Sequence, residues 1–447
     1  MTHFRSNTEV TLSRRVALKI LNTVEQGQKL DVAFTALSEN LNPRDRSWCR
    51  ELVYGVQRLR GRIDYLLNRK IHKGINSLNS TVRDTLRMSL YQILYMSSVP
   101  EYAAVSQAVE LIRSTEGESA TGFVNAVLRA TVADGDGYEH FPDCELDPLG
   151  FLSTWGSHPR WLVERWLERW SLEDVQRLVE ANNSVPSIYL RCLGVTPEEA
   201  IEILANVGIK SALAGYGTGC VVLIGEYSLT EAMAVVPSVV QDPASALVVP
   251  YVDPEPEKIV ADLCSAPGGK TMAMAARGNL VIAADLSFER LGFVWDNINR
   301  ISTGFRDHND FKVHLVQADA VAPVLKSADV VLLDVPCTGT GTLRRNPDAR
   351  WKLTLESLKK LVKLQDRILE VSSNLLASGG LIAYSTCSLE EEENEDCISR
   401  FLQDHKDFEI DPGSGVEEIY MNDQGQLCIM PQNFGFDGAF AARLRKN

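Results

Sequence analysis

The chain has 447 residues, of which 45% are apolar and 23% charged, so we expect a globular protein with more than one core. No apolar run reaches the length of a membrane span, and the polar segment 1–10 is unlike a signal peptide. The nine cysteines lack the spacing of a zinc site or a disulfide framework. These features argue against a membrane protein and predict a cytoplasmic protein with reduced thiols and no metal.

Charge is distributed unevenly along the chain, whose net charge is −14. Residues 1–90 contain sixteen basic and eight acidic residues, a net charge of +8, so the remainder carries −22. A basic module in an acidic protein indicates a polyanionic partner such as RNA. Solvated helix faces with chance charge are the alternative explanation.

Helical periodicity dominates residues 1–135. Apolar side chains recur at helical spacing, as at Val82, Leu86 and Leu90, and proline or glycine interrupts the pattern, as at Pro100. The pattern predicts a compact all-helical domain.

A polar, turn-rich linker follows, and residues 136–240 are expected to form linker helices and a small α+β subdomain. Short strand candidates there flank a helix at 196–206. Trp161, Trp166 and Trp170 lie at helical spacing, a pattern more typical of packing than of base stacking.

Strands and helices alternate regularly over residues 241–447. This alternation predicts an open parallel sheet with helices on both faces and ligands at the carboxyl ends of the strands. The strand candidates are Ile259–Leu263, Leu280–Ala284, Val313–Val316, Val330–Leu333 and Leu381–Tyr384.

The first of these strands leads into Cys264-Ser265-Ala266-Pro267-Gly268-Gly269-Lys270. Glycines before a helix let backbone N–H groups approach an electron-rich ligand. The loop matches neither a dinucleotide fingerprint nor a P-loop, and taken alone it could equally be an ordinary strand–turn–helix corner.

Acids and thiols follow the other strands. Asp285 ends the second strand, where an acid usually binds ribose hydroxyls, and Asp319 follows the third and could bind an adenine amine. Asp334 and Cys337 follow the fourth strand, and Cys387 follows the fifth. Their joint placement at strand ends is hard to attribute to chance.

Two cysteines at neighbouring strand ends suit covalent catalysis on a pyrimidine. Carbon 5 of cytosine is too electron-poor to attack an electrophile directly. A thiolate that adds at carbon 6 converts the ring into an enamine whose carbon 5 can accept a methyl group. A carboxyl group such as Asp334 at the nitrogen edge of the ring would stabilise the developing charge.

The chain resembles the RNA cytosine-C5 methyltransferases that use S-adenosylmethionine. Five segments match the motifs of that family in order, together with Arg345-Asn346-Pro347-Asp348: Gln241-Asp242-Pro243-Ala244-Ser245, Cys264 to Lys270, Asp334-Val335-Pro336-Cys337-Thr338-Gly339, Ser385-Thr386-Cys387-Ser388 and Phe436-Asp437-Gly438-Ala439-Phe440. The helical N-terminal region resembles a NusB-type RNA-binding bundle. As a whole the chain is similar to the bacterial 16S rRNA methyltransferases of the Sun group.

The resemblance implies an α/β fold: a Rossmann-like class I methyltransferase domain at 241–447, an all-α NusB-like domain at 1–135 and a small α+β insert between them. It implies that the small α+β subdomain within residues 136–240 binds RNA. It implies that Cys387 is the nucleophile and that Cys337 assists proton removal or product release. It also implies that Asp334 engages the cytosine edge and that Lys270 orients it. S-adenosylmethionine would be bound by Cys264, Ser265, Ala266, Pro267, Gly268, Gly269, Lys270, Asp285, Asp319 and Asp334. The implied partner is small-subunit rRNA, and the expected state is a monomer.

Several alternatives stay open from the sequence. Cys337 could be the attacking thiol, as the Pro-Cys thiol is in DNA cytosine methyltransferases. The substrate could be tRNA, or the chain could be a non-catalytic RNA-binding factor of ribosome assembly. Retention of both cysteines and of Asp334 favours an enzyme.

Two expectations concern the surroundings of the site. Ser388-Leu389-Glu390-Glu391 reads as a capping box, which would place Cys387 just before a helix whose first-turn acids point to solvent. A basic cluster after the fourth strand could line a path for phosphates, and it consists of Arg344, Arg345, Arg350, Lys352, Lys359, Lys360 and Lys363.

Overall fold

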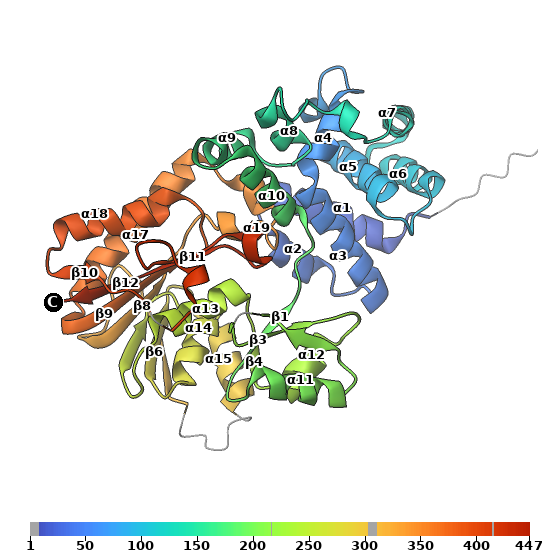
Figure 1. Ribbon diagram of the computed structural model, residues 1–447. Coiled ribbons are helices and arrows are strands. Elements are labelled where there is room, and N and C mark those ends of the chain that lie inside the picture. The colour runs from blue at the N-terminus through green and yellow to red at the C-terminus, as the bar shows by residue number, and fades with distance from the viewer. Residues whose placement is uncertain (1–8, 216, 303–310, 414) are drawn as a thin grey trace, which may run out of the picture. The chain divides into compact units, whose positions relative to one another are not determined.

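The computed structural model describes residues 9–215, 217–302, 311–413 and 415–447, which form two compact units (Figure 1). One unit comprises the chain up to Ser184 together with Leu343–Lys352, and the other comprises Val185–Thr342 and Leu353–Asn447. The segment Leu343–Lys352 therefore belongs to the first unit, although the residues before and after it in the sequence belong to the second. The expected domain boundaries at residues 135 and 240 stay a prediction.

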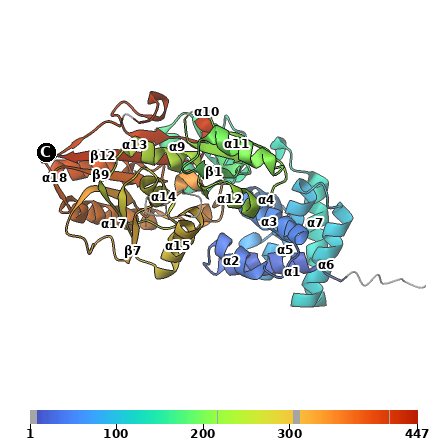
Figure 2. The same cartoon turned by 90° about the horizontal axis from the view of Figure 1, so that it is seen from below.

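The first unit is helical, as the periodicity predicts. Its helices are α1 (Leu12–Glu25), α2 (Leu30–Leu37), α3 (Pro43–Arg58), α4 (Arg60–Asn68), α5 (Ser80–Tyr95), α6 (Glu101–Glu116), α7 (Thr121–Asp134), α8 (Pro148–Thr154), α9 (Arg160–Arg169), α10 (Leu172–Asn183) and the short α16 (Ala349–Lys352). Helix α5 contributes Leu86 and Leu90 to the core and packs on α1, α3, α6 and α7 (Figure 2). Trp166 of α9 is 1% exposed, so this tryptophan packs in the core.

The second unit begins with a small sheet of order β2-β3-β1-β4. Its strands are β1 (Tyr189–Cys192), β2 (Ser211–Leu213), β3 (Cys220–Leu223) and β4 (Ser238–Val240), with helices α11 (Pro197–Asn206) and α12 (Leu229–Val235). Apolar residues of α11 and α12 pack with those of β1 and β3 in one cluster, which includes Leu190, Leu204 and Ala232. The predicted α+β arrangement of this segment is confirmed.

The main sheet has the order β7-β6-β5-β8-β9-β12-β10, and β11 pairs with β12. Its strands are β5 (Ile259–Asp262), β6 (Leu280–Asp285), β7 (Val313–Gln317), β8 (Ala328–Asp334), β9 (Leu376–Thr386), β10 (Phe408–Ile410), β11 (Leu427–Ile429) and β12 (Ala439–Lys446). The first five are parallel and include every predicted strand. The predicted open parallel sheet is confirmed for these five strands, and the C-terminal strand β12, which the sequence analysis did not include, pairs antiparallel with β9.

Helices cover both faces of this sheet, because its central strands are apolar on both sides. Val330 and Leu332 of β8 join α13 (Pro243–Val252), α14 (Gly269–Ala275) and α15 (Phe288–Ser302) in one core. Val331 and Leu333 point to the opposite face and join α17 (Leu355–Ser373) and α18 (Glu395–Asp404) in another (Figure 1). The short helix α19 (Pro431–Phe434) precedes the last strand.

Within the described parts of the chain, no helix combines the length and the apolar character needed to span a bilayer.

Candidate active site

The loop after β5 turns sharply into α14. Gly268 has φ +102°, a conformation that disfavours other residues, and a Cβ there would lie 3.1 Å from Val294. A Cβ on Gly269 would lie 2.9 Å from the Gln241 amide. The two glycines therefore let the backbone approach its surroundings closely at the start of α14.

Two buried acids stand beside this loop, at the ends of β5 and β6. Asp262 accepts a hydrogen bond from the Thr271 hydroxyl at 2.6 Å, and its burial raises its pKa to about 7. Asp285 accepts from the backbone N–H of Ala266 at 3.2 Å and from that of Ser287 at 3.0 Å. The structure thus ties the loop to both neighbouring strands.

Polar groups in and near this loop are available to bind a ligand. The Ser265 hydroxyl is buried and has no hydrogen-bond partner among the described residues. Asp319 follows β7 and is exposed, with one carboxylate oxygen accepting from the Val321 N–H at 3.0 Å. Asp285 and Asp319 lie beyond adjacent parallel strands, so both face the same edge of the sheet as the loop.

Asp334 ends β8 and is held on both sides. The Lys270 ammonium donates to its Oδ2 at 2.8 Å, and the Ser385 hydroxyl donates to its Oδ1 at 2.9 Å. Lys270 is fixed in turn by the Ser245 hydroxyl at 2.9 Å. The Asp334 side chain keeps 38% of its surface exposed, which leaves it open to a ligand. Ser245 and Ser385 lie in the motifs read from the sequence, but no role was predicted for either.

The two predicted thiols are brought together. Strands β8 and β9 run parallel with Asp334 opposite Ser385, and Cys337 and Cys387 follow these two residues closely. Their sulfur atoms are 3.2 Å apart, and the Cys387 N–H points at the Cys337 sulfur from 3.4 Å. Both cysteines are reduced and half-buried.

The thiols of this region differ in their electrostatics. The hydrogen bond with Cys387, followed by burial, raises the pKa of Cys337 well above its usual value. Burial also raises the pKa of Cys264, with neighbouring carboxylates adding to the shift. Cys264 is therefore a poor nucleophile, and its predicted part in the ligand loop stays a prediction.

The expected capping box after Cys387 is wrong. Helix α18 begins only at Glu395, after a short 3-10 turn at Glu391–Glu393, and Ser388 instead accepts from the Glu390 N–H at 3.0 Å. The acids do not all face solvent either, because Glu390 is 2% and Glu393 0% exposed. Glu393 accepts hydrogen bonds from the loop that carries Cys337. Because this loop is distant in the sequence, the residues next to Glu393 give no indication that it is buried.

The expected phosphate path is also wrong for two of its three arginines. Arg344 is 7% exposed and Arg350 0% exposed, because the segment Leu343–Lys352 is folded into the helical unit. Arg350 donates to the backbone oxygens of Ser157 and Asn182 there. The lysines Lys359, Lys360 and Lys363 on α17 are exposed, as expected of a basic helix surface.

Some of the basic side chains of residues 1–90 are likewise buried. Arg87 is 1% exposed and is paired with Asp64 at 2.7 Å and Asp84 at 2.9 Å. These ion pairs reduce the charge available to a polyanion. Among residues 9–90, the arginines and lysines that are exposed are Arg15, Lys19, Lys29, Arg44, Arg46, Arg50, Arg69 and Lys73.

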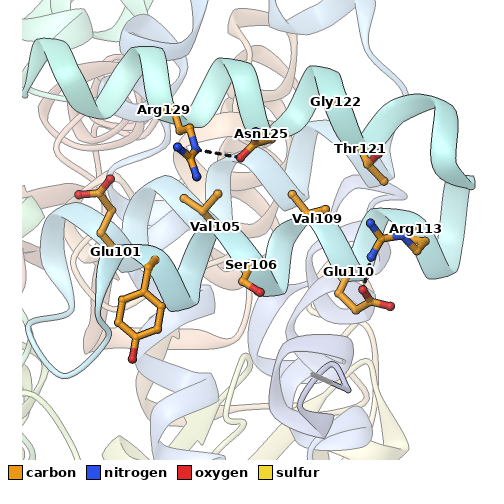
Figure 3. A pocket seen from close by; sticks show the side chains of 11 residues that line it. Glu101, Val105, Ser106, Val109, Glu110, Arg113, Thr121, Gly122, Asn125 and Arg129 are labelled. Atoms are coloured by element: carbon orange, nitrogen blue, oxygen red, sulfur yellow. Dashed lines mark hydrogen bonds and ion pairs between the residues drawn. The ribbon is translucent and has the colours of Figure 1, made fainter. Parts of the chain in front are cut away.

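The helical unit has a groove of about 770 Å³ between α6 and α7 (Figure 3). Both arginines that line this groove already have partners. Arg113 forms an ion pair with Glu110, and Arg129 donates a hydrogen bond to Asn125 at 3.1 Å (Figure 3). Glu101 adds a negative charge at one end, so the groove lacks the excess positive charge that phosphates require. Within the described residues, no cluster of His, Cys, Asp and Glu side chains has the makings of a metal site.

Fold and site together define a class of Rossmann-like enzymes with a thiol pair beside a glycine-containing ligand loop. The chain matches the model of 16S rRNA methyltransferase RsmB/F over residues 249–445, the NusB family over 11–133 and the RsmF/B-like ferredoxin-like domain over 158–230. The probable ribosomal RNA small subunit methyltransferase B of Synechocystis is 33% identical over 97% of this chain and 99% of its own. The chain belongs to the RsmB/F family of 16S rRNA methyltransferases.

Two further matches extend over nearly the whole length. The probable ribosomal RNA small subunit methyltransferase B of Bacillus subtilis is 30% identical over 98% of this chain and 99% of its own. The solved structure titled PH0851 is 24% identical and has a TM-score of 0.78, covering 97% of this chain and 98% of its own. The second match establishes a shared fold.

Proposed function

We propose that this chain transfers a methyl group from S-adenosylmethionine to carbon 5 of a cytosine in 16S rRNA, through a covalent bond between Cys387 and the base. The observation that carries the proposal is the pair of free thiols, 3.2 Å apart, beside an open carboxylate. Cytosine needs a nucleophile at carbon 6 and a polar group at its nitrogen edge, and this edge of the sheet supplies both.

The Cys387 thiolate adds to carbon 6, and the electron pair of the carbon 5–carbon 6 double bond becomes available at carbon 5. Asp334 engages the nitrogen edge of the ring while Lys270 and Ser385 hold its carboxylate in place. After methyl transfer, carbon 5 gives its proton to a water molecule, the C–H electron pair re-forms the carbon 5–carbon 6 double bond, and the bond from carbon 6 to the Cys387 sulfur breaks with both electrons going to sulfur. We assign Cys337 to this release, because its raised pKa keeps a proton that can bond to the departing sulfur.

The residues of the ligand loop fit the proposed methyl donor. S-adenosylmethionine supplies a methyl group bound to a positively charged sulfur. Backbone N–H groups beside Gly268 and Gly269, together with the unpartnered Ser265 hydroxyl, can bind its polar groups. Asp285 and Asp319, at the ends of two adjacent strands, are assigned to its ribose and its base.

The RNA partner is supported by the exposed bases of the helical unit. Arg44, Arg46 and Arg50 lie on α3, and Lys29 precedes α2, so basic side chains gather on neighbouring elements. Such a surface binds phosphates without reading sequence. The target base has to leave its stack, because its carbon 6 must reach a half-buried thiol.

Replacement of the nucleophile tests the function. Cys387→Ser should lower methyl transfer to 16S rRNA on the order of 10³-fold or more, since an alcohol is a far weaker nucleophile than a thiolate. Binding of S-adenosylmethionine, measured by calorimetry, should persist. The matched control is Cys144→Ser, a half-buried cysteine of the helical unit. Turnover that survives in Cys387→Ser would refute the mechanism.

A further inference from the structure

A buried carboxylate lies beneath the thiol pair. Glu393 is 0% exposed, and its Oε1 accepts from the Thr338 N–H at 2.9 Å and from the Gln365 amide at 2.9 Å. Its Oε2 accepts from the Thr338 hydroxyl. Three donors therefore converge on one side chain, and two of them come from the residue that follows Cys337.

The same network holds the other neighbour of Cys337. Gln365 also donates to the Pro336 carbonyl at 2.9 Å, so Pro336 and Thr338 are both tied to Glu393, one of them through the glutamine. Cys337 sits between these two anchored residues. The position of its sulfur thus depends on a carboxylate more than fifty residues further along the chain.

The network reaches Cys387 as well. The Thr338 hydroxyl lies 3.0 Å from the Ser388 hydroxyl, which is next to Cys387. Asn394, which follows Glu393, accepts from the Thr386 hydroxyl at 2.6 Å and donates to the Ser388 carbonyl at 2.9 Å. Glu393 and Asn394 therefore anchor the residues on both sides of each thiol.

A buried carboxylate is costly to desolvate and is a poor means of adding stability compared with an apolar side chain. Its donors here all come from the loop of Cys337 or from the glutamine that braces this loop. We propose that Glu393 is a positioning residue that holds Cys337 against the Cys387 sulfur and thereby supports release of the methylated base. The assignment to the release step rests on the proposed function, whereas the assignment to sulfur spacing does not.

The release step can be tested with two variants. Glu393→Ala removes all three contacts, so the adduct with unmodified cytosine RNA should accumulate on a denaturing gel while turnover falls by about tenfold or more. Glu393→Gln keeps an acceptor for Thr338 N–H and Gln365, and its amide can donate to the Thr338 hydroxyl, so turnover should stay within about threefold of wild type. Asp396→Asn, an exposed acid of α18, is the control for lost charge.

The sulfur spacing can be tested without any substrate. Diamide takes two electrons and two protons from a pair of close thiols and joins the sulfurs, and peptide mass spectrometry identifies the Cys337–Cys387 link. In the wild type and in Glu393→Gln this link should form rapidly, whereas in Glu393→Ala its rate should fall by about tenfold or more, because the loop is released. If Glu393→Ala does not fold, Thr338→Val removes the hydroxyl contacts with Glu393 and Ser388 but keeps the N–H contact with Glu393, and it should give a smaller change in the same direction.

Each result decides one of the two proposals. Unchanged cross-linking in Glu393→Ala, or in Thr338→Val as its substitute, would overturn the positioning role. Loss of turnover without accumulated adduct would overturn the assignment to release. If the wild type transfers no methyl group to 16S rRNA while cross-linking still depends on Glu393, the positioning role stands and the proposed function fails.

Discussion

Cys337 and Cys387 occupy unequal surroundings although their sulfur atoms are 3.2 Å apart. The hydrogen bond with Cys387, followed by burial, raises the pKa of Cys337 well above its usual value, so a thiol proton is held beside the Cys387 sulfur. The assignment of Cys387 as nucleophile stays a prediction, as does the alternative in which Cys337 attacks.

Removal of the Cys337 thiol tests this assignment. In Cys337→Ala the Cys387 adduct should still form, but release should slow on the order of 10²-fold, because the leaving sulfur loses its proton donor. The protein–RNA adduct should then be visible on a denaturing gel with unmodified RNA. The double variant Cys337→Ala/Cys387→Ser should show no adduct. An adduct that persists in Cys387→Ser but disappears in Cys337→Ala would reverse the two roles.

Among the elements, the segment Leu343–Lys352 is bound to the helical unit by several side chains, including Asp348, Arg350 and Trp351. Arg350 donates to the carbonyls of Ser157, Asn182 and Leu343 and to the Asn183 side chain. Burial, with a smaller contribution from Arg58, lowers its pKa to about 9, so the guanidinium remains charged at neutral pH. A charged group that satisfies several buried carbonyls is expensive to delete.

Arg350→Ala should therefore destabilise the helical unit by about 3 kcal/mol or more, since it leaves several buried acceptors unsatisfied. The change is measured as a shift of the thermal or urea midpoint monitored by circular dichroism. Arg367→Ala removes an exposed arginine of α17 and serves as the control. Equal shifts in the two variants would contradict the role assigned to Arg350.

The surroundings of Arg350 also predict that the stability of the helical unit depends on pH. His158 is 1% exposed; burial, followed by the charge of Arg350, lowers its pKa well below the usual 6.5. Its Nδ1 pairs with the Gly156 carbonyl at 2.7 Å, and Asn182 donates to its Nε2 at 3.3 Å, so the folded unit keeps the ring neutral. Below about pH 6.5 the unfolded chain binds a proton that the folded unit does not.

The free energy of unfolding of the helical unit should therefore fall as the pH drops from about 6.5 to 5. In His158→Gln this fall should be smaller, because the titrating group is gone. Urea titrations at several pH values measure the difference. Parallel pH curves for the wild type and the variant would show that His158 does not contribute.

At the scale of the whole molecule, the two compact units do not correspond to two continuous pieces of sequence. The chain leaves the second unit after Thr342, contributes Leu343–Lys352 to the helical unit, and returns at Leu353. A cut near Ser184 therefore separates this segment from the helices that satisfy Arg350. The linear order of the motifs hides this exchange.

Limited proteolysis of a fragment tests the exchange. In the full chain trypsin should spare Arg350, which is 0% exposed. In a fragment of residues 185–447 the partners of Arg350 on Ser157, Asn182 and Asn183 are absent, so cleavage within Leu343–Lys352 should be among the earliest events. Mass spectrometry identifies the sites. Arg443, 8% exposed within the second unit, should resist in both and serves as the internal control. Equal resistance of the segment in both forms would argue against its place in the helical unit.

The sequence by itself determined the helical region, the α+β segment, the five parallel strands and the acids and thiols at their ends. These features depend on periodicity and on short motifs, which are local properties of the chain. Since parallel strands present their carboxyl ends at one edge, the meeting of Cys337 with Cys387 also followed from local patterns.

Only the tertiary structure decided which charges are used inside the protein. Glu393 looked like one of several solvent acids, and Arg350 like part of a phosphate path, yet each is buried among donors or acceptors from distant segments. The antiparallel pairing of β12 with β9 is of the same kind. From the sequence alone a charged residue is predicted to be exposed, because charged side chains are seldom buried without a partner. Partners that are far apart in the sequence produce no periodic pattern that would reveal the pairing.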